Sequence, residues 1–431
     1  MNRMRKIITI LILIIMSIGL SSCKQSTKDV TINENKPSVL KGNVTIWSSN
    51  TDVTLLNEEA QLFKKKNPQV SINITVSDMN TVGDKLSKNL KDKSELPDIL
   101  TLEDKDVPTV VDKFKDNLLT TGNASWFKSS GSIKYQIHNS TYSSKEYAFP
   151  WYVDPVFMVY REDILEGLNV KSEDIKYWSQ YLNVGEGPVK AAGKGMISID
   201  YFNNSVLYNI GLHQLGINYF NSSDKLDLEN SIKPAQLLQD SYNSKILYDD
   251  SKIGGKLNAF ANGNTVSLAC DLSTLYDIQN KYPGLKGKLN VEKLPAFEPG
   301  GNRAAVEFGE NIIALKKAGQ NKAAMEFIKY ITQDDETSSL EFEKYGYVTS
   351  NVSAYSNIKL YKNNSFYKNK SLGRIAIDQV NGLPDVKYNK YFTQIKDTLQ
   401  NSIIDTSVTN GDLKQNIYNV QNSLETSNTI K

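Results

Sequence analysis

The apolar positions after residue 40 change their spacing from segment to segment. Residues 44–47 form a short apolar run, apolar positions recur every three or four residues over 56–63, and they alternate with polar ones over 70–76. A further helical stretch at 82–90 precedes another apolar run at 99–102. A period of 3.6 predicts a helix and a period of two predicts a strand. The resulting order of strand, helix and strand predicts a parallel crossover unit that opens a doubly wound α/β domain.

Similar patterning continues to the end of the chain. It predicts helices at 163–168, 204–215, 233–243 and 323–331, two final helices from 392 and 413, and strands at 196–199, 265–270 and 311–315. A second α/β layer therefore follows the first. A chain of 431 residues is also too long for a single hydrophobic core, so we expect at least two domains.

The beginning of the chain follows a different pattern. Three basic residues among the first six precede an apolar run over 7–20, which is too short for a spanning helix of about 20 residues. This pattern predicts a secretory signal peptide at residues 1–22. The sequence LSSC ending at Cys23 resembles the lipobox of bacterial lipoproteins, which implies cleavage before Cys23 and acylation (palmitate) of its sulfur. Residues 23–40 are polar and predict a flexible, lipidated tether at the outer face of the cell membrane.

Charge and composition exclude several kinds of site. The net charge of +2 becomes −1 without the three basic residues of the signal peptide, and a near-neutral body argues against a nucleic-acid partner. His138 and His213 have no Cys or second His at ligand spacing, so we expect no metal site. Glycine-rich phosphate motifs are absent, so we expect no cofactor. Cys270 ends an apolar run and is predicted to be a buried small residue.

The predicted strands are followed by polar residues where a ligand is expected. Doubly wound sheets bind ligands beyond the carboxyl ends of their strands, and here Asn50 and Glu103 follow two such ends. Residues 147–160 are dense in aromatic and apolar side chains around one acid, Asp154, which needs a partner if it is buried. The chain holds 23 Tyr, 14 Phe and 4 Trp. Some of these rings on a concave surface would suit a sugar, which has apolar faces and many hydroxyls.

Several segments occur in the order of a known family. The segments VTIW, FKKKNPQV, LPDI, YAFPWYVDPVFMVYRED, FANGNTVSLA and NKAAMEFIKYIT together resemble extracellular solute-binding proteins of carbohydrate ABC importers, the maltose-binding-protein-like family 1. The resemblance covers about residues 42–424. It implies an α/β, two-lobed periplasmic-binding-protein-like fold of class II, in which hinge segments join the lobes and a ligand cleft lies between them.

Matching by motif also places the lobes. The crossings between them are expected at 151–155, 307–310 and 346–350. The N-terminal α/β lobe then comprises 40–152 plus 309–348, and the C-terminal α/β lobe comprises 153–308 plus 349–431.

The chain departs from the family pattern at three places. Relatives often start a helix with Thr-Trp-Asp/Glu where this chain has YWSQ, so Trp178 is expected to pack in the core. Residues 271–273 stand where relatives often carry Trp, so one stacking surface is expected to be missing. The third crossing often has Pro where this chain reads YVT at 347–349.

The resemblance and the strand-end positions together give a set of candidate ligand-binding residues. Trp151 is expected to stack on a sugar face, with packing at the hinge as the alternative. Asp154 is expected to accept paired hydroxyls, because its place beside the first crossing matches a ligand-contacting acid position in the family. The supporting candidates are Tyr152, Asn50, Glu103, Asp200, Tyr201, Asp271, Phe308 and Glu310, whose alternative is a core position or a solvated loop end.

The function implied by the resemblance is that of a receptor, not an enzyme. A monomeric binding protein, anchored outside the cell by lipid on Cys23, would capture a sugar by hinge closure and deliver it to the permease subunits of an ABC importer. Two alternatives stay open. One is a receptor for a non-sugar solute, and the other is an anchored glycosidase, which would need a pair of carboxylates in the cleft.

Overall fold

A computed structural model describes residues 39–78, 81–221, 223, 225–368, 370–427 and 430. The predicted signal peptide, Cys23 and nearly all of the predicted tether lie outside these residues. Residues 40–431 form one compact unit, which is considered by itself below. Among the helices of the described ranges, none is both long enough and apolar enough to cross a membrane.

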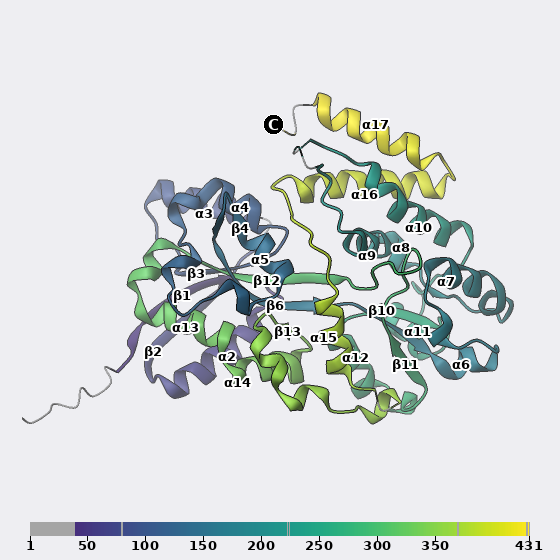
Figure 1. The fold of residues 1–431 in the computed structure, drawn as a ribbon, viewed down its shortest axis with the longest axis horizontal. Coiled ribbons are helices and arrows are strands. Elements are labelled where there is room, and N and C mark those ends of the chain that lie inside the picture. The colour runs from purple at the N-terminus through teal and green to yellow at the C-terminus, as the bar shows by residue number, and fades with distance from the viewer. Residues whose placement is uncertain are drawn as a thin grey trace, which may run out of the picture. The chain divides into compact units, whose positions relative to one another are not determined.

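The first lobe is built on a six-stranded sheet with the order β13-β6-β12-β3-β1-β2 (Figure 1). Its strands are β1 (Lys41–Ser48), β2 (Gln69–Val76), β3 (Ile99–Glu103), β6 (Ala148–Pro155), β12 (Val306–Ala314) and β13 (Val348–Thr349). Strand β1 pairs in parallel with β2 and β3, which confirms the predicted crossover unit. The pairs formed by β12 and β6 are antiparallel, a feature that apolar spacing alone does not reveal.

Helices cover both faces of this sheet. They are α2 (Val53–Lys66), α3 (Val82–Asp92), α4 (Val107–Phe114), α5 (Lys134–Ser140), α13 (Lys322–Gln333) and α14 (Asp335–Leu340). Helices α2 and α13 pack on the face that carries Val44 and Ile46. Helices α3 and α4 pack on the opposite face with Trp47 and Leu100. Strands that are apolar on both sides are typical of a sheet enclosed between two helix layers, and Trp47 is a core residue here.

The second lobe centres on an antiparallel sheet of order β10-β7-β11 with a parallel pair, β8 and β9, beside it. The strands are β7 (Phe157–Arg161), β8 (Ile197–Ser198), β9 (Leu247–Tyr248), β10 (Ser267–Cys270) and β11 (Leu289–Glu292). The helices are α6 (Glu162–Gly167), α7 (Trp178–Val184), α8 (Asp200–Asn203), α9 (Val206–Leu215), α10 (Ile232–Asn243), α11 (Lys256–Ala261), α12 (Leu272–Lys281) and α15 (Leu372–Asn381). Trp178 is buried and its Nε1 donates to Gln214 at 2.9 Å, which confirms its packing role, and Cys270 is buried as predicted.

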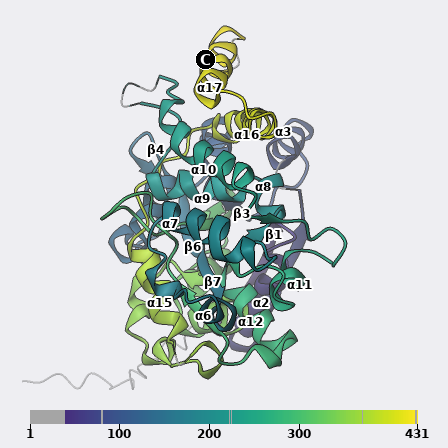
Figure 2. The ribbon, with the colours of Figure 1, turned by 90° about the vertical axis from the view of Figure 1, so that its right-hand side faces the viewer.

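The chain ends on the second lobe. Helices α16 (Phe392–Val408) and α17 (Leu413–Thr426) pack against each other and against α10. Figures 1 and 2 both show this pair at one end of the molecule, at the top of each view. The two final helices predicted from their apolar spacing are therefore confirmed.

Three neighbouring strands, β13, β6 and β12, contain the segments where crossings were expected. Strand β6 leads into β7 of the second sheet with only Val156 between them, so one nearly continuous ribbon joins the two sheets. The two-lobed α/β fold is confirmed. The residue limits given above for each lobe stay a prediction.

At the third crossing, Gly346 lets the backbone pass very close to the N-terminus of α12. Gly346 has φ of +76°, and a Cβ atom built there would lie 2.5 Å from the backbone nitrogen of Ser273 and 2.8 Å from the carbonyl carbon of Leu272. A side chain at this position therefore meets both backbone strain and a clash with the N-terminus of α12.

We expect Gly346→Ala to lower the free energy of unfolding by about 2 kcal/mol or more, because strain and overlap add. Gly300 is a matched control, since its φ is +75° and a Cβ atom there meets nothing within 4 Å. Gly300→Ala should cost only about 1 kcal/mol. Urea denaturation of both variants checks this, and equal losses would contradict the close approach at Gly346.

Candidate ligand-binding cavity

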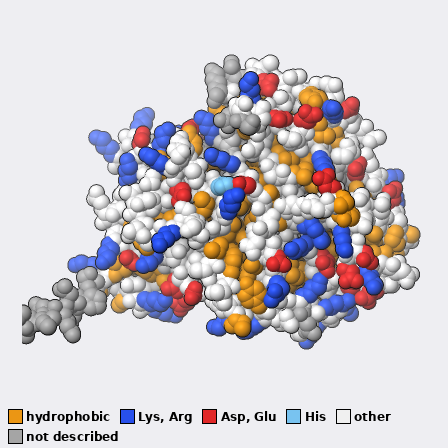
Figure 3. Space-filling view, viewed as in Figure 1, with side chains coloured by type: hydrophobic (Ala, Val, Ile, Leu, Met, Phe, Trp, Pro, Cys, Tyr) orange, Lys and Arg blue, Asp and Glu red, His pale blue; other side chains and the backbone are white. Residues whose placement is uncertain are grey.

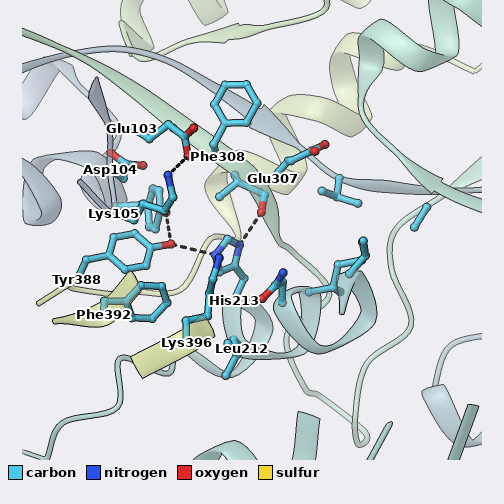
Figure 4. A pocket seen from close by; sticks show the side chains of 18 of the residues that line it. Glu103, Asp104, Lys105, Leu212, His213, Glu307, Phe308, Tyr388, Phe392 and Lys396 are labelled. Carbon is cyan, nitrogen blue, oxygen red and sulfur yellow. Dashed lines mark hydrogen bonds and ion pairs between the residues drawn. The ribbon is translucent and has the colours of Figure 1, made fainter. Parts of the chain in front are cut away.

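A cavity of about 220 Å³ lies between the two lobes. The first lobe contributes the end of β3 with Glu103 to Lys105, and the second lobe contributes α8, α9 and the end of β10. Residues 306–309 of the crossing strand β12 form part of the wall, and Tyr388, Phe392 and Lys396 close it from the C-terminal side (Figure 4). Because both lobes and a crossing strand line it, the size of this cavity depends on how the lobes meet.

A chain of hydrogen bonds fixes one end of the cavity. His213 Nδ1 lies 2.5 Å from the carbonyl oxygen of Val306, which can only accept, so Nδ1 carries the proton. The unprotonated Nε2 then accepts from the hydroxyl of Tyr388 at 2.9 Å, and the oxygen of Tyr388 accepts from Tyr135 at 3.2 Å. Burial lowers the pKa of His213 to about 4, so the ring is neutral at pH 7. Figure 4 shows Tyr388 pointing toward His213.

Charged side chains lie around the same end. Lys105 Nζ contacts Glu103 at 2.5 Å and Asp106 at 2.9 Å, so both carboxylates share one cation. Burial lowers the pKa of Lys396. This end of the cavity offers hydroxyl, imidazole, carboxylate and ammonium groups within one wall, which suits a ligand with many hydroxyls.

A strap, defined as residues 384–391, joins the second lobe to the first beside this network. Its Asp385 pairs with His138, and its Lys390 pairs with Asp112 at 2.8 Å. The backbone N–H of Tyr388 donates to Asn139 Oδ1 at 3.0 Å. The strap is thus held by polar contacts on α4 and α5 of the first lobe.

A buried acid, Asp104, forms part of the cavity wall. Asp104 Oδ1 accepts from Asn311 Nδ2 at 2.7 Å, while its Oδ2 is buried without a hydrogen-bond partner. Burial raises the pKa of Asp104 to about 7. A Cβ atom at Gly309 would lie 2.1 Å from Asp104 Oδ2, so only glycine fits at this point of β12.

Three aromatic rings meet where the crossing segments run side by side. Tyr152 of β6 stacks on Tyr347, which precedes β13, with centroids 4.1 Å apart and planes 6° apart. Phe308 of β12 meets both rings edge-on at 6.2 and 6.3 Å. Each crossing segment therefore contributes one ring, and Phe308 is half-buried and lines the cavity.

The hydroxyl of Tyr152 is bound to a buried acid at the carboxyl end of β1. It donates to Asp52, whose other oxygen accepts from Ser49 at 2.7 Å and Thr101 at 2.9 Å. Burial and the neighbouring Asp52 raise the pKa of Glu310 well above its usual value. Tyr152 and Glu310 are thus buried parts of the first lobe that lie behind the cavity wall.

Three carboxylates gather at the crossings on the second-lobe side. Oxygens of Asp154, Asp271 and Glu307 all lie within 4.8 Å of one another. Asp271 caps α12, because its Oδ1 accepts from the backbone N–H of Thr274 at 2.6 Å. Burial raises the pKa of Asp154 well above its usual value, and Asp271 and Glu307 add to the shift. Two candidates from the sequence are thus brought together with Glu307, which was not predicted.

The other candidates are distributed over distinct places. Glu103, Tyr201 and Phe308 line the cavity. Asp200 lies beside it and pairs with Lys256 at 3.1 Å, and Asn50 is exposed in the loop after β1. None of these positions by itself tests ligand binding, so the assignments stay predictions.

Trp151 occupies the core of the first lobe. It is fully buried, it belongs to the core cluster that includes Phe327, and it is not among the residues that line the cavity. Two buried acids, Glu59 and Glu341, lie beside it. This placement favours a packing role for Trp151 over stacking on a sugar face.

Sequence reasoning missed much of the cavity wall. His213 was considered only as a metal ligand, and Asn209 sits on the same predicted helix without a recognisable motif. Phe392 and Lys396 lie four residues apart on the predicted helix from 392, a spacing that could have drawn attention to one helical face, whereas Tyr388 lies in the strap before this helix. Nothing local indicates that this face turns toward the first lobe.

The buried acids predict how stability changes with pH. Asp104 and Glu341 have pKa values raised by burial to about 7 and about 8, so both bind protons more tightly in the folded than in the unfolded chain. Their stabilising effect is complete in acid and is lost as pH rises through these values. We expect the free energy of unfolding to be at least about 1 kcal/mol lower at pH 8.5 than at pH 5.5.

Denaturation midpoints at both pH values check this prediction. Asp104→Asn should reduce the difference, while Asp84→Asn, a change at an exposed acid, should leave it unaltered. A free energy of unfolding that rises toward pH 8.5 would contradict the assignment.

Comparison with known proteins places the chain. The sequence model of the family described as bacterial extracellular solute-binding protein matches residues 47–337. The arabinooligosaccharide-binding protein of Bacillus subtilis is 26% identical over 214 residues, 48% of each chain, and the lactose-binding protein of Rhizobium radiobacter is 24% identical over 304 residues, 68% of this chain and 71% of that one. The chain thus spans about half the length of the first of these relatives.

Solved structures agree on the fold. The sugar-binding protein MalE from Xanthomonas citri superposes with a TM-score of 0.72 at 16% identity, over 89% of this chain and 96% of that one. The galacto-N-biose-/lacto-N-biose I-binding protein from Bifidobacterium longum gives 0.70 at 18% identity, over 90% and 98%. Since the family description alone covers about two thirds of the sequence, the chain belongs to the family of bacterial extracellular solute-binding proteins.

Proposed function

We propose that this chain is the substrate-binding lipoprotein of an ABC importer, and that it takes up a sugar or an oligosaccharide between its lobes. The observation that carries the proposal is the inter-lobe cavity with aromatic and hydroxyl-binding groups in one wall. Phe308 and Tyr201 supply rings there, and Glu103 and Glu307 supply carboxylates. Sugars present apolar C–H faces and hydroxyl edges, which such a wall matches. The relatives named for arabinooligosaccharides and lactose support the same class of ligand.

The size of the cavity bears on how the ligand enters. At about 220 Å³ it is smaller than the roughly 300–1,000 Å³ that is usual for ligand pockets. An oligosaccharide therefore needs the lobes to move apart at β6, β12 and β13. Binding then favours closure only if the ligand interacts better with the closed form than with the open one. Side chains of the second lobe, such as Tyr201, supply that difference.

The lipid on Cys23 belongs to the same mechanism. A monomeric receptor on a polar tether stays close to the permease subunits that it feeds, which raises its effective concentration there. The net charge of the chain is close to zero, and Figure 3 shows basic and acidic side chains interspersed over the visible face.

Two alternative functions predict different experimental results. A receptor for a non-sugar solute would ignore mono- and oligosaccharides altogether. An anchored glycosidase would release products, and the carboxylates of Asp154, Asp271 and Glu307 are the group that such chemistry would use. Product analysis after incubation with the protein separates the receptor from the enzyme.

The main test is titration of the soluble Cys23→Ser chain with a panel of sugars, followed by tryptophan fluorescence and thermal unfolding. A specific sugar at a hundred times its Kd should add about 2.7 kcal/mol to the free energy of unfolding. Phe308→Ala should raise the Kd about tenfold or more, because it removes a ring from the cavity wall. Phe127→Ala, which removes a half-buried ring outside the cavity, should leave the Kd unchanged. No response to any sugar would overturn the carbohydrate assignment.

The anchor has its own test. Cys23→Ser should leave sugar binding intact and release the receptor from the membrane, so uptake at low external sugar concentration should fall severalfold. Uptake assays in cells with the wild-type and variant receptors at equal amounts check this. Undiminished uptake would remove the anchor from the mechanism.

A further inference from the structure

The three carboxylates at the crossings form an unusual concentration of negative charge. Asp154 is 1% exposed, Asp271 is half-buried and Glu307 is exposed, and their oxygens lie within 4.8 Å of one another. No ion pair among the described residues involves any of the three. Lys256 is a basic side chain that acts on Glu307 through its charge, and it already pairs with Asp200 at 3.1 Å.

A bulge in β12 and the N-terminus of α12 bring these three side chains together. Strand β12 pairs Val306 with Pro155 and then Gly309 with Val153, so Glu307 and Phe308 together stand opposite Asp154. Such a bulge turns side chains away from their normal direction in a sheet. Asp271 reaches the same point from the N-terminus of α12, where its Oδ1 is occupied by Thr274 and Ser273 and its Oδ2 is left for the cluster.

A second observation indicates a missing partner. Asp154 Oδ1 is buried and accepts no hydrogen bond. A buried carboxylate oxygen without a donor is costly, and here two further carboxylates increase the cost. Asp154 therefore has either a proton or a bound cation as its partner, and the oxygens that surround it could supply the rest of a coordination shell.

We propose that Asp154, Asp271 and Glu307 bind a divalent metal ion, and that this ion is calcium. Calcium takes six to eight oxygen ligands at about 2.3–2.6 Å, so oxygens up to about 5 Å apart can share one ion. Magnesium demands near-ideal octahedral geometry and usually keeps several of its waters, and zinc prefers nitrogen and sulfur ligands, so an all-carboxylate cluster on three separate segments suits calcium best. With Asp271 Oδ1 occupied, the three carboxylates supply up to five oxygens, and water or a hydroxyl of the ligand completes the shell.

The ion would connect three segments that are far apart in the sequence. Asp154 belongs to β6 and Glu307 to β12, which are both crossing strands, whereas Asp271 belongs to the second lobe. Glu307 also lines the cavity, so the ion lies at its edge. Bound calcium would hold the N-terminus of α12 against the crossings and thereby order the second-lobe side of the cleft. The site itself does not depend on the proposed transport function.

This site cannot be recognised in the sequence because its ligands are scattered. Positions 154, 271 and 307 lie on three different elements, and no short motif links them. Only the bulge in β12 and the cap of α12 bring them together.

The test uses the full chain as its soluble Cys23→Ser variant, freed of metal with a chelator and titrated with calcium chloride. Calorimetry should give one site per chain with a Kd below about 1 mM, in the range of extracellular calcium modules. Thermal unfolding should shift upward in calcium, less in magnesium, and not at all in sodium chloride of equal ionic strength.

Variants decide whether the signal comes from this cluster. Asp154→Asn replaces a buried acid that needs a proton or a cation by a neutral amide, so the metal-free variant should unfold at a higher temperature than the metal-free parent, while its calcium shift disappears. Glu307→Gln should weaken calcium binding at least tenfold. Asp277→Asn, on the exposed side of the same helix α12, should bind calcium like the parent.

Two outcomes overturn the proposal. The expected upper limit of the Kd is about 1 mM. One contrary outcome is that calcium, at concentrations up to about ten times this limit, produces neither heat in calorimetry nor a shift in thermal unfolding. The other is a calcium shift that persists in Asp154→Asn. Neither outcome depends on sugar binding, so failure of the calcium site and failure of the carbohydrate assignment are distinguishable.

Discussion

The structure depends on one arrangement, the hydrogen-bonded ladder of β13, β6 and β12 at one side of the first sheet. These strands are at once part of the first lobe and the connections to the second. A strand that pairs on both sides cannot slide or rotate by itself, so the three connections share one register. The rings of Tyr152, Phe308 and Tyr347 and the acids Asp154 and Glu307 all project from this ladder or its bulge. The joint between the lobes and the floor of the cleft are therefore the same element.

Buried acids accompany this ladder on both sides. Asp52, Asp104 and Glu310 lie on the first-lobe side, and burial raises the pKa of each. A charge that is removed from water without a cation costs free energy, so these groups reduce stability at neutral pH unless they are protonated or paired. Hydroxyl donors offset part of the cost at Asp52, where Tyr152, Ser49 and Thr101 converge. The edge of the first sheet that faces the cavity is therefore polar.

Much of the fold could be predicted from the sequence because its elements have clear periods. The strand at 70–76 alternates strictly, and the helix at 323–331 has a well-defined apolar face, so both were found within two residues of their ends. The candidate site could be predicted only in part. Asp154 is a candidate because the family resemblance marks the first crossing, and its role stays a prediction, whereas Glu307 was missed because a bulge, not a motif, turns it toward Asp154. Trp151 shows the converse, since its neighbours in sequence suggested a ligand platform and its fully buried ring lies in the core.

Movement of the lobes has a definite weak point. The strap at residues 384–391 holds α4 and α5 of the first lobe by several polar contacts, among them Lys390 with Asp112 and the backbone of Tyr388 with Asn139. Toward the second lobe, Tyr388 donates one neutral hydrogen bond to His213 at the cavity. One neutral hydrogen bond contributes about 1 kcal/mol, less than the strap's contacts to the first lobe taken together. Separation of the lobes at this side therefore opens the bond between Tyr388 and His213 first. A ligand hydroxyl that replaces Tyr388 as donor to His213 Nε2 would restore what opening loses, and it would do so inside the cavity.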